Sequence, residues 1–377
     1  MSNVREIAKR AGVSITTVSR VLNNHATVNT ELRDRVLAEV NKTRYAAAAG
    51  RPDVVNLGLV YIAEASAAEM LNSPFDTALL QGVASGMAEQ DYNMLILDAS
   101  RDSRRDETFT QMFHRRGVRA AIIRGGSRDR QLCQRIAAEG FPSVVIGERF
   151  GDQGGEAAVG FVRSDSRPAS LEAVRHLIEL GHRRIAICLN WNPDDDHADR
   201  HDAYEQALTE AGLDVDPSLV IRLPALRHSG SQLIHRILAM PNPPTAAFIT
   251  DPVVAIGALH EALQSGVRVP QQLSIIGFDD ANLRLETYPP MAAVCQDARQ
   301  VGATAARAAM SLLGNPDLPP QRHVLDTWLE LRGSVGPGPA SPEPPRRRNR
   351  PGRSSSTSQA KETTGNVESQ APASPTE

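Results

Sequence analysis

The clearest chemical pattern lies near the start of the chain, between Asn3 and Asn23. In this stretch, side chains that can donate hydrogen bonds recur at spacings that place them on one face of a helix. Hydroxyl groups so placed can bond phosphate oxygens, an exposed apolar side chain can contact a thymine methyl, and arginine can bond guanine through two parallel hydrogen bonds. The expected DNA-contacting residues here are Ser14, Ile15, Thr16, Thr17, Ser19, Arg20 and Asn23.

Two short helices joined by a glycine turn would hold this face in place. Asn3 can cap a helix from Val4 to Ala11, and Gly12 can adopt the left-handed backbone that ends it. Ser14 can then cap a second helix of similar length. This arrangement is the helix-turn-helix, whose second helix fits the major groove of DNA. The alternative interpretation is a helical hairpin that only packs.

The charge of the chain is unevenly distributed. The first 52 residues hold nine Lys or Arg against four acidic residues, a formal charge of +5, although the whole chain of 377 residues carries −3. The central part of the sequence must therefore be acidic. A basic segment on an acidic body is the electrostatic pattern of a protein that binds the phosphate backbone.

Composition excludes several other classes of protein. Hydrophobic residues make up 41% of the chain, enough for the cores of two or three domains. Cys133, Cys188 and Cys295 are far apart and match no metal-ligand spacing, which is typical of the reducing cytoplasm. No apolar stretch approaches a membrane span, and no signal peptide is visible. No phosphate-cradling glycine loop, nucleophile elbow or HExxH motif is present, so no catalytic residue and no cofactor are expected.

The segments GVSITTVSRVLNN and VNTELRDRV closely resemble the DNA-binding head of the lac-repressor (LacI/GalR) family of bacterial transcription regulators. A third helix from Thr30 to Thr43 would complete this head. The segments HLIELGHRRIA, SIIGFDD and LELRGS extend the resemblance over residues 3 to 334. The resemblance implies a regulator whose affinity for operator DNA is controlled by a small ligand.

From Val54 onward, short apolar strands alternate with helices, which indicates parallel sheets covered on both faces. Two such series imply two lobes with a cleft at the carboxyl ends of the strands. The resemblance implies a periplasmic-binding-protein-like pair of lobes, with crossings near Val162, Tyr288 and Pro320. The expected domains are a helix-turn-helix domain (1–45), a short linker (46–53), a two-lobed effector-binding and dimerisation domain (54–335; lobe 1 about 54–162 and 289–320, lobe 2 about 163–288 and 321–335) and a disordered tail rich in Pro, Ser and Arg (336–377).

The linker departs from the family pattern. In the family, an aromatic residue at the position of Tyr45 precedes a hinge helix whose leucine enters the minor groove and kinks the duplex. Here Ala46 to Pro52 is shorter and contains no leucine. We therefore expect an operator that is not kinked at its centre, with Arg51 reaching a narrow minor groove.

The resemblance also implies an effector site in the cleft, where paired carboxylates and an arginine would suit polyols. Each acidic residue at a strand end could instead cap the following helix, and Trp191 could anchor its loop. The run from Asp194 to His197 could suggest a metal site, but consecutive carboxylates more often form a solvated loop, so no metal is expected. Thr250-Asp251 and Ala298 depart from the family pattern, so the effector's identity stays open. The expected effector-binding residues are Phe75, Asp165, Trp191, Arg200, Thr250, Asp251 and Asp279.

The sequence thus predicts a regulator that binds double-stranded DNA, and we expect it to be a repressor. It would act as a homodimer on a palindromic operator. It would be located in the bacterial cytoplasm and associate with the nucleoid when bound to DNA. A sugar or sugar derivative would be its effector, and no membrane partner is expected. One alternative is an effector-independent regulator with a degenerate cleft. Another is an enzyme on the α/β lobes, which no motif supports. The basic cluster of the tail is either solvated or a sequence-independent phosphate contact; it comprises Arg346, Arg347, Arg348, Arg350 and Arg353.

Overall fold

The structure of the chain is a computed structural model. Some predictions concern residues that the structure does not describe: Asn23, Arg51 with the rest of the linker, and the tail from residue 340 onward. They therefore stay predictions. The described residues are 4–22, 28–43, 55–62, 73–104, 106–125, 130–148, 159–191, 195–315 and 318–339.

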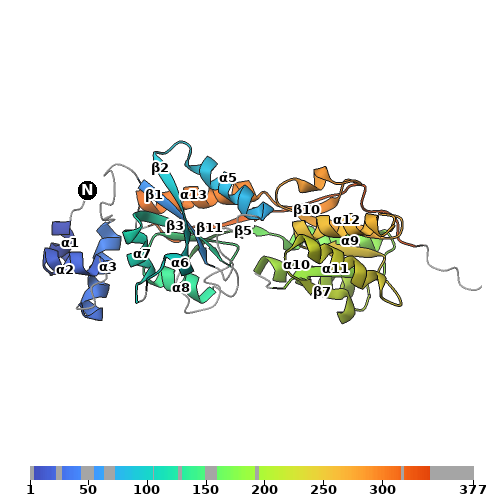
Figure 1. Cartoon of the computed structure of the whole chain (residues 1–377), viewed down its shortest axis with the longest axis horizontal. Helices are drawn as coiled ribbons and strands as arrows, with labels where there is room; N and C mark the ends of the chain where they lie inside the picture. The colour runs from blue at the N-terminus through green and yellow to red at the C-terminus, as the bar shows by residue number, and fades with distance from the viewer. Residues whose placement is uncertain are drawn as a thin grey trace, which may run out of the picture. The chain divides into compact units, whose positions relative to one another are not determined.

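Three helices make up the N-terminal head (Figure 1). Gly12 has a φ of 65°, the left-handed backbone that turns the chain between the first two helices. Ile7, Val18 and Val36, one from each helix, are fully buried in a common core. The helices are α1 (Val4–Ala11), α2 (Ile15–Leu22) and α3 (Thr30–Thr43), and the predicted helix-turn-helix is confirmed.

The first lobe is a six-stranded parallel sheet between two helical layers. Its strands follow the order β11-β5-β4-β3-β1-β2. One face packs on α5 and α13 and the other on α7 and α8, each through its own apolar core (Figure 1). The elements are β1 (Val55–Ile62), α5 (Pro74–Met87), β2 (Tyr92–Asp98), α6 (Ala99–Asp102), α7 (Phe109–Arg115), β3 (Val118–Gly125), α8 (Arg130–Ala138), β4 (Ser143–Ile146), β5 (Gly160–Asp165), α13 (Ala298–Gly314) and β11 (Arg322–Asp326).

The second lobe repeats this plan with the strand order β12-β10-β9-β8-β6-β7. Only β12 runs antiparallel among the described strands of this sheet. Helices α11 and α12 cover one face, and α9 and α10 cover the other. The elements are α9 (Arg167–Glu179), β6 (Ile185–Asn190), α10 (Asp195–Glu210), η2 (Pro217–Leu219), β7 (Val220–Leu223), α11 (Arg227–Leu238), β8 (Ala246–Ile249), α12 (Pro252–Gln264), β9 (Ser274–Asp279), η3 (Leu283–Glu286), β10 (Ala292–Cys295) and β12 (Trp328–Glu330).

Strand pairing places the second and third crossings between the lobes later in the chain than the sequence suggested. Because β10 pairs with β9, the chain stays in lobe 2 through Cys295 and does not leave it near Tyr288. Because β11 pairs with β5, the chain stays in lobe 1 through Asp326 and does not leave it near Pro320. Hydrogen-bond partners decide which sheet a strand joins, and an apolar pattern does not identify those partners.

Glycines allow the covering helices to pack closely in each lobe. A Cβ atom on Gly82 of α5 would lie 2.0 Å from the carbonyl oxygen of Arg299 in α13. In lobe 2, a Cβ atom on Gly257 of α12 would lie 2.1 Å from the carbonyl oxygen of Arg227 in α11. Larger side chains would push these helices apart. Among the described residues, no helix is long and apolar enough to cross a membrane.

Candidate functional site

The second helix of the head presents a polar face to solvent. Ser14 caps this helix, because the Thr17 amide donates to its hydroxyl oxygen at 3.0 Å. Ile15 is 49% exposed although it is a large apolar residue, whereas Val18 on the opposite face is fully buried. The exposed side chains of α2 are Ile15, Thr16, Ser19 and Arg20. Five of the residues that the sequence predicted to contact DNA are therefore exposed, whereas Thr17 is half-buried with its hydroxyl 2.8 Å from that of Ser14.

Arg200 of α10 lies at the centre of a polar cluster in lobe 2. Its Nη1 donates to the backbone oxygen of Thr250 at 2.8 Å, and its Nε donates to Ser166 Oγ at 3.4 Å. Its guanidinium carbon lies 3.6 Å from the centre of the Phe278 ring, close enough for a cation–π contact. The side chain is only 4% exposed. These contacts fix Arg200 over the carboxyl ends of β8 and β9.

Asp251 follows β8 and caps the next helix, α12. Its Oδ1 accepts hydrogen bonds from the amides of Val253 at 3.0 Å and Val254 at 3.1 Å. Burial raises the pKa of Asp251, while these amide hydrogen bonds and the nearby His197 and Arg200 act in the opposite direction. Asp251 therefore has the capping role that was one of its two possible roles, and it also lies near Arg200.

Asp279 is the last residue of β9, and its carboxylate is bonded to groups of the protein itself. Its carboxylate pairs with the guanidinium of Arg284 at 2.7 Å, and it also accepts backbone amide hydrogen bonds from the loop that follows. Arg284 in turn reaches Glu330 of β12, with its Nε 2.6 Å from a carboxylate oxygen. No role for Arg284 was predicted from the sequence. An arginine five residues after a strand-end aspartate was the available signal.

Asp280 and Gln296 lie side by side at the same edge of the sheet, and neither was predicted. The Nε2 atom of Gln296 donates to Oδ1 of Asp280 at 2.5 Å. Burial raises the pKa of Asp280 to about 7, although the hydrogen bond from Gln296 and the charge of Arg200 lower it. The available signals were the second aspartate of the Phe-Asp-Asp segment and the glutamine that follows β10.

The other predicted effector residues lie on different elements. Phe75, the second residue of α5, packs on the core of lobe 1 beneath the guanidinium of Arg124, 4.8 Å from its ring centre. Asp165 ends β5, and its backbone oxygen accepts a hydrogen bond from Thr327 Oγ1 at 2.7 Å. Trp191 is 63% exposed, so its ring does not anchor the loop by burial. The structure thus groups Arg200, Thr250, Asp251 and Asp279 through direct contacts or neighbouring strand ends. Among the described residues, it shows no such link for Phe75, Asp165 or Trp191.

The acidic run after Trp191 is not the open loop that the sequence suggested, because α10 begins at Asp195. Asp199 pairs with Arg163 of β5 at 2.5 Å, and Asp196 lies 3.4 Å from the same guanidinium. Arg163 is 5% exposed and belongs to the sheet of lobe 1. Arg163 of β5 and these two carboxylates of α10 therefore form a buried ionic cluster that joins the two lobes beside the first crossing.

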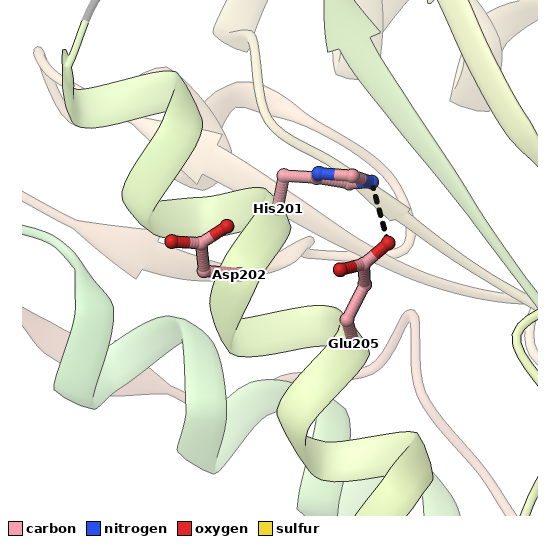
Figure 2. Close-up of side chains that lie close together, drawn as sticks. All are labelled: His201, Asp202 and Glu205. Carbon is pink, nitrogen blue, oxygen red and sulfur yellow. Dashed lines mark ion pairs between the residues drawn. The ribbon is translucent and has the colours of Figure 1, made fainter.

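His201, Asp202 and Glu205 of α10 offer ligand atoms within 4.8 Å of one another. His201 and Glu205 point toward each other, with Nε2 and Oε1 3.4 Å apart, and Asp202 leaves the helix on a different side (Figure 2). Asp202 also pairs with Arg167 at 3.4 Å. A surface ion pair of helical spacing and a carboxylate neutralised by arginine account for these three residues without a metal ion.

A helix-turn-helix head and two α/β lobes with polar groups at their strand ends define a DNA-binding protein with a ligand-binding body. Residues 3–47 match the family model for bacterial regulatory proteins of the lacI family, and residues 174–335 match a periplasmic binding protein-like domain. The transcriptional regulator DegA of Bacillus subtilis is 30% identical, with 89% of this chain and 98% of DegA covered. This chain belongs to the lacI family of bacterial regulatory proteins.

Other relatives share the whole architecture. The ribose operon repressor of Haemophilus influenzae is 28% identical, with 89% of this chain and 99% of that protein covered. The solved structure of the transcriptional regulator CelR in complex with cellobiose is 26% identical and has a TM-score of 0.63, with 89% of this chain and all of CelR covered. The family and fold expected from the sequence are confirmed, and the chain is a DNA-binding transcription regulator.

Proposed function

We propose that the protein is a repressor that reads operator DNA with the exposed face of α2. A small polar ligand bound at the Arg200 cluster would control its operator affinity. The observation that carries this proposal is the buried cluster itself, in which Arg200 joins the ends of β8 and β9 beside two further carboxylates. In open α/β sheets, ligands bind at the carboxyl ends of the strands. The proposed site involves no catalytic chemistry.

Sugars and sugar derivatives are the proposed class of ligand. Carboxylates, an arginine and a glutamine offer several acceptors and donors in fixed directions, as hydroxyl-rich ligands require. Two relatives support this choice, since one is a ribose operon repressor and another was solved with cellobiose. Because Thr250 and Ala298 differ from the family pattern, the sugar bound by this protein could differ from those of the two relatives.

We further propose that the protein acts as a homodimer in the bacterial cytoplasm, on the nucleoid when it is bound to DNA. One recognition helix covers only a half-site, so two copies related by a two-fold axis would read a palindrome. The relatives with the same architecture are themselves transcriptional regulators and repressors, which supports the proposal.

Arg20→Ala tests the assignment of α2. Arg20 is exposed on the polar face of the helix and can bond guanine through two hydrogen bonds. We expect the substitution to weaken binding to the cognate palindrome by about 1–3 kcal/mol and to relax base choice at one position of each half-site. Selection from a random duplex library, followed by anisotropy titrations, measures both effects.

Arg10→Ala is the matched control, because Arg10 is an exposed arginine of α1 that pairs with Glu6 at 2.8 Å. We expect this control to retain the base preference of the wild type. If Arg20→Ala weakens binding equally on all sequences, Arg20 contacts phosphate and the assignment of base reading to this residue is wrong.

A further inference from the structure

Helix α7 of lobe 1 buries a polar face. Its apolar side chains pack in the core of lobe 1 and lie on one side of the helix. Its polar side chains recur at i, i+1 and i+4, which places them on the opposite side. A helix that covers a sheet normally exposes such a face to water. Here the three polar residues are at most 4% exposed: Thr110, Gln111 and His114. Other parts of the chain must therefore cover this face.

Gln111 joins this face to the N-terminal head. Its Nε2 donates a hydrogen bond of 3.0 Å to the backbone oxygen of Val21 in α2, and the bond is buried. Its Oε1 accepts the backbone amide of Thr108 at 3.0 Å, as one half of the capping box that begins α7. One side chain thus links the start of a lobe 1 helix to the second helix of the helix-turn-helix.

The contact satisfies a carbonyl group of α2. This helix ends at Leu22, so Val21 lies in its last turn, where carbonyl groups have no donor within the helix. Gln111 supplies a donor to one of these groups. The contact is made at the C-terminal end of α2, and the side chains proposed to read DNA stay exposed along its side. The bond is therefore compatible with DNA binding.

Lobe 1 holds Gln111 in a fixed position. The hydroxyl of Thr108 accepts the backbone amide of Gln111 at 3.2 Å. The carboxylate of Glu139, which follows α8, accepts the amides of Phe109 at 3.2 Å and Thr110 at 2.6 Å. These bonds fix the start of α7 to the body of the lobe, so a head bonded to Gln111 moves with lobe 1.

We infer that α7 is a docking surface for the chain's own head and that Gln111 fixes the direction in which lobe 1 presents α2 to DNA. This inference goes beyond the proposed function, which does not specify how the head is held. A head held in place loses less conformational freedom when it binds a half-site, so docking strengthens operator binding. A rearrangement of lobe 1 would also reach α2 through this bond.

Gln111→Glu tests the contact without removing the cap of α7. Glutamate keeps the oxygen that accepts the Thr108 amide and is itself a preferred residue at this position of a capping box. It removes the donor to Val21 and places a carboxylate beside the negative end of the α2 dipole. We expect the head to detach while the thermal midpoint of the lobes stays that of the wild type.

Time-resolved fluorescence anisotropy measures docking in the full chain without DNA or ligand. Ala38 of α3 is exposed, so a cysteine placed there can carry a dye, whereas the native Cys133, Cys188 and Cys295 are buried. With Gln111 intact, the dye should rotate with the whole molecule. In Gln111→Glu, a faster rotation of the detached head should appear.

Operator affinity gives a second readout. Gln111→Glu should weaken binding to the selected palindrome by about 2- to 12-fold for each head, the range expected for one hydrogen bond. Gln131→Glu is the matched control, because Gln131 is an exposed glutamine of α8 and the substitution adds the same charge to lobe 1. It should leave the rotation of the head and the operator affinity unchanged.

Thr108→Ala separates docking from the stability of α7. It removes the hydroxyl cap but keeps the Nε2 donor of Gln111, so it should lower the thermal midpoint and leave the head docked. A fast head rotation already present in the wild type would overturn the inference, and so would an unchanged rotation in Gln111→Glu. Tighter operator binding by Gln111→Glu would also overturn it, because the docked head would then be restrained from DNA.

Discussion

Operator affinity is expected to fall by roughly 10³- to 10⁵-fold when salt is raised from about 50 to about 200 mM, if the dimer neutralises about 6–10 phosphates. The first 52 residues carry a formal charge of +5 in a chain of net charge −3. Each neutralised phosphate releases counterions, and this release becomes less favourable as salt rises. The exposed basic side chains of the described head are Arg5, Lys9, Arg10, Arg20 and Arg35.

Anisotropy titrations at several salt concentrations give the slope of the logarithm of affinity against the logarithm of salt concentration. Lys9→Ala should lower the slope by about one for each phosphate contact it removes, equally for cognate and unrelated duplexes. Arg268→Ala, which removes a basic residue of lobe 2, should leave the slope unchanged. A flat salt dependence of the wild type would show that the basic head does not bind the phosphate backbone.

Arg284→Ala is expected to destabilise the protein by about 3–5 kcal/mol, because it leaves the buried carboxylate of Asp279 without its cation. Arg284 is 7% exposed and joins Asp279 of β9 to Glu330 of β12. Burial alone would lower the pKa of Arg284, but its hydrogen bonds to these two carboxylates raise it. The pair therefore fastens the antiparallel edge strand of lobe 2 to the loop beside the proposed ligand site.

Chemical denaturation of the wild type and variants measures this effect. Arg167→Ala is the matched control, because Arg167 is 40% exposed in its ion pair with Asp202 and should contribute only about 0–1 kcal/mol. Adding Asp279→Asn to Arg284→Ala should recover part of the loss, since the charge left unpaired is then absent. A cost for Arg284→Ala as small as that of Arg167→Ala would show that Asp279 does not depend on this cation.

Local sequence signals were sufficient to predict the head. A hydroxyl residue before a helix and a glycine after one act over a few residues, and Ser14 caps α2 and Gly12 turns the chain as predicted. The alternation of strands and helices likewise predicted two layered sheets. Each of these features depends on residues that are close together in the sequence.

The candidate effector site was harder to predict, because its geometry depends on pairing between distant strands. Asp279 and Asp280 are adjacent in sequence, but only the fold of the following loop, which brings Arg284 back to the strand end, distinguishes their roles. Gln296 joins the site through the register of β9 with β10. The edge position of β12 depends in the same way on a partner far away in the chain.

The central claim is that a ligand at the Arg200 cluster controls binding of the head to its operator. The most direct test is an anisotropy titration of a labelled operator duplex, with and without each sugar of a panel that includes ribose and cellobiose, for the wild type and for Arg200→Ala. We predict that at least one of these sugars changes wild-type affinity by about 5- to 150-fold. Arg200→Ala should bind the operator like the unliganded wild type and show no response to sugar. A normal sugar response in Arg200→Ala, or none in the wild type, would contradict the claim.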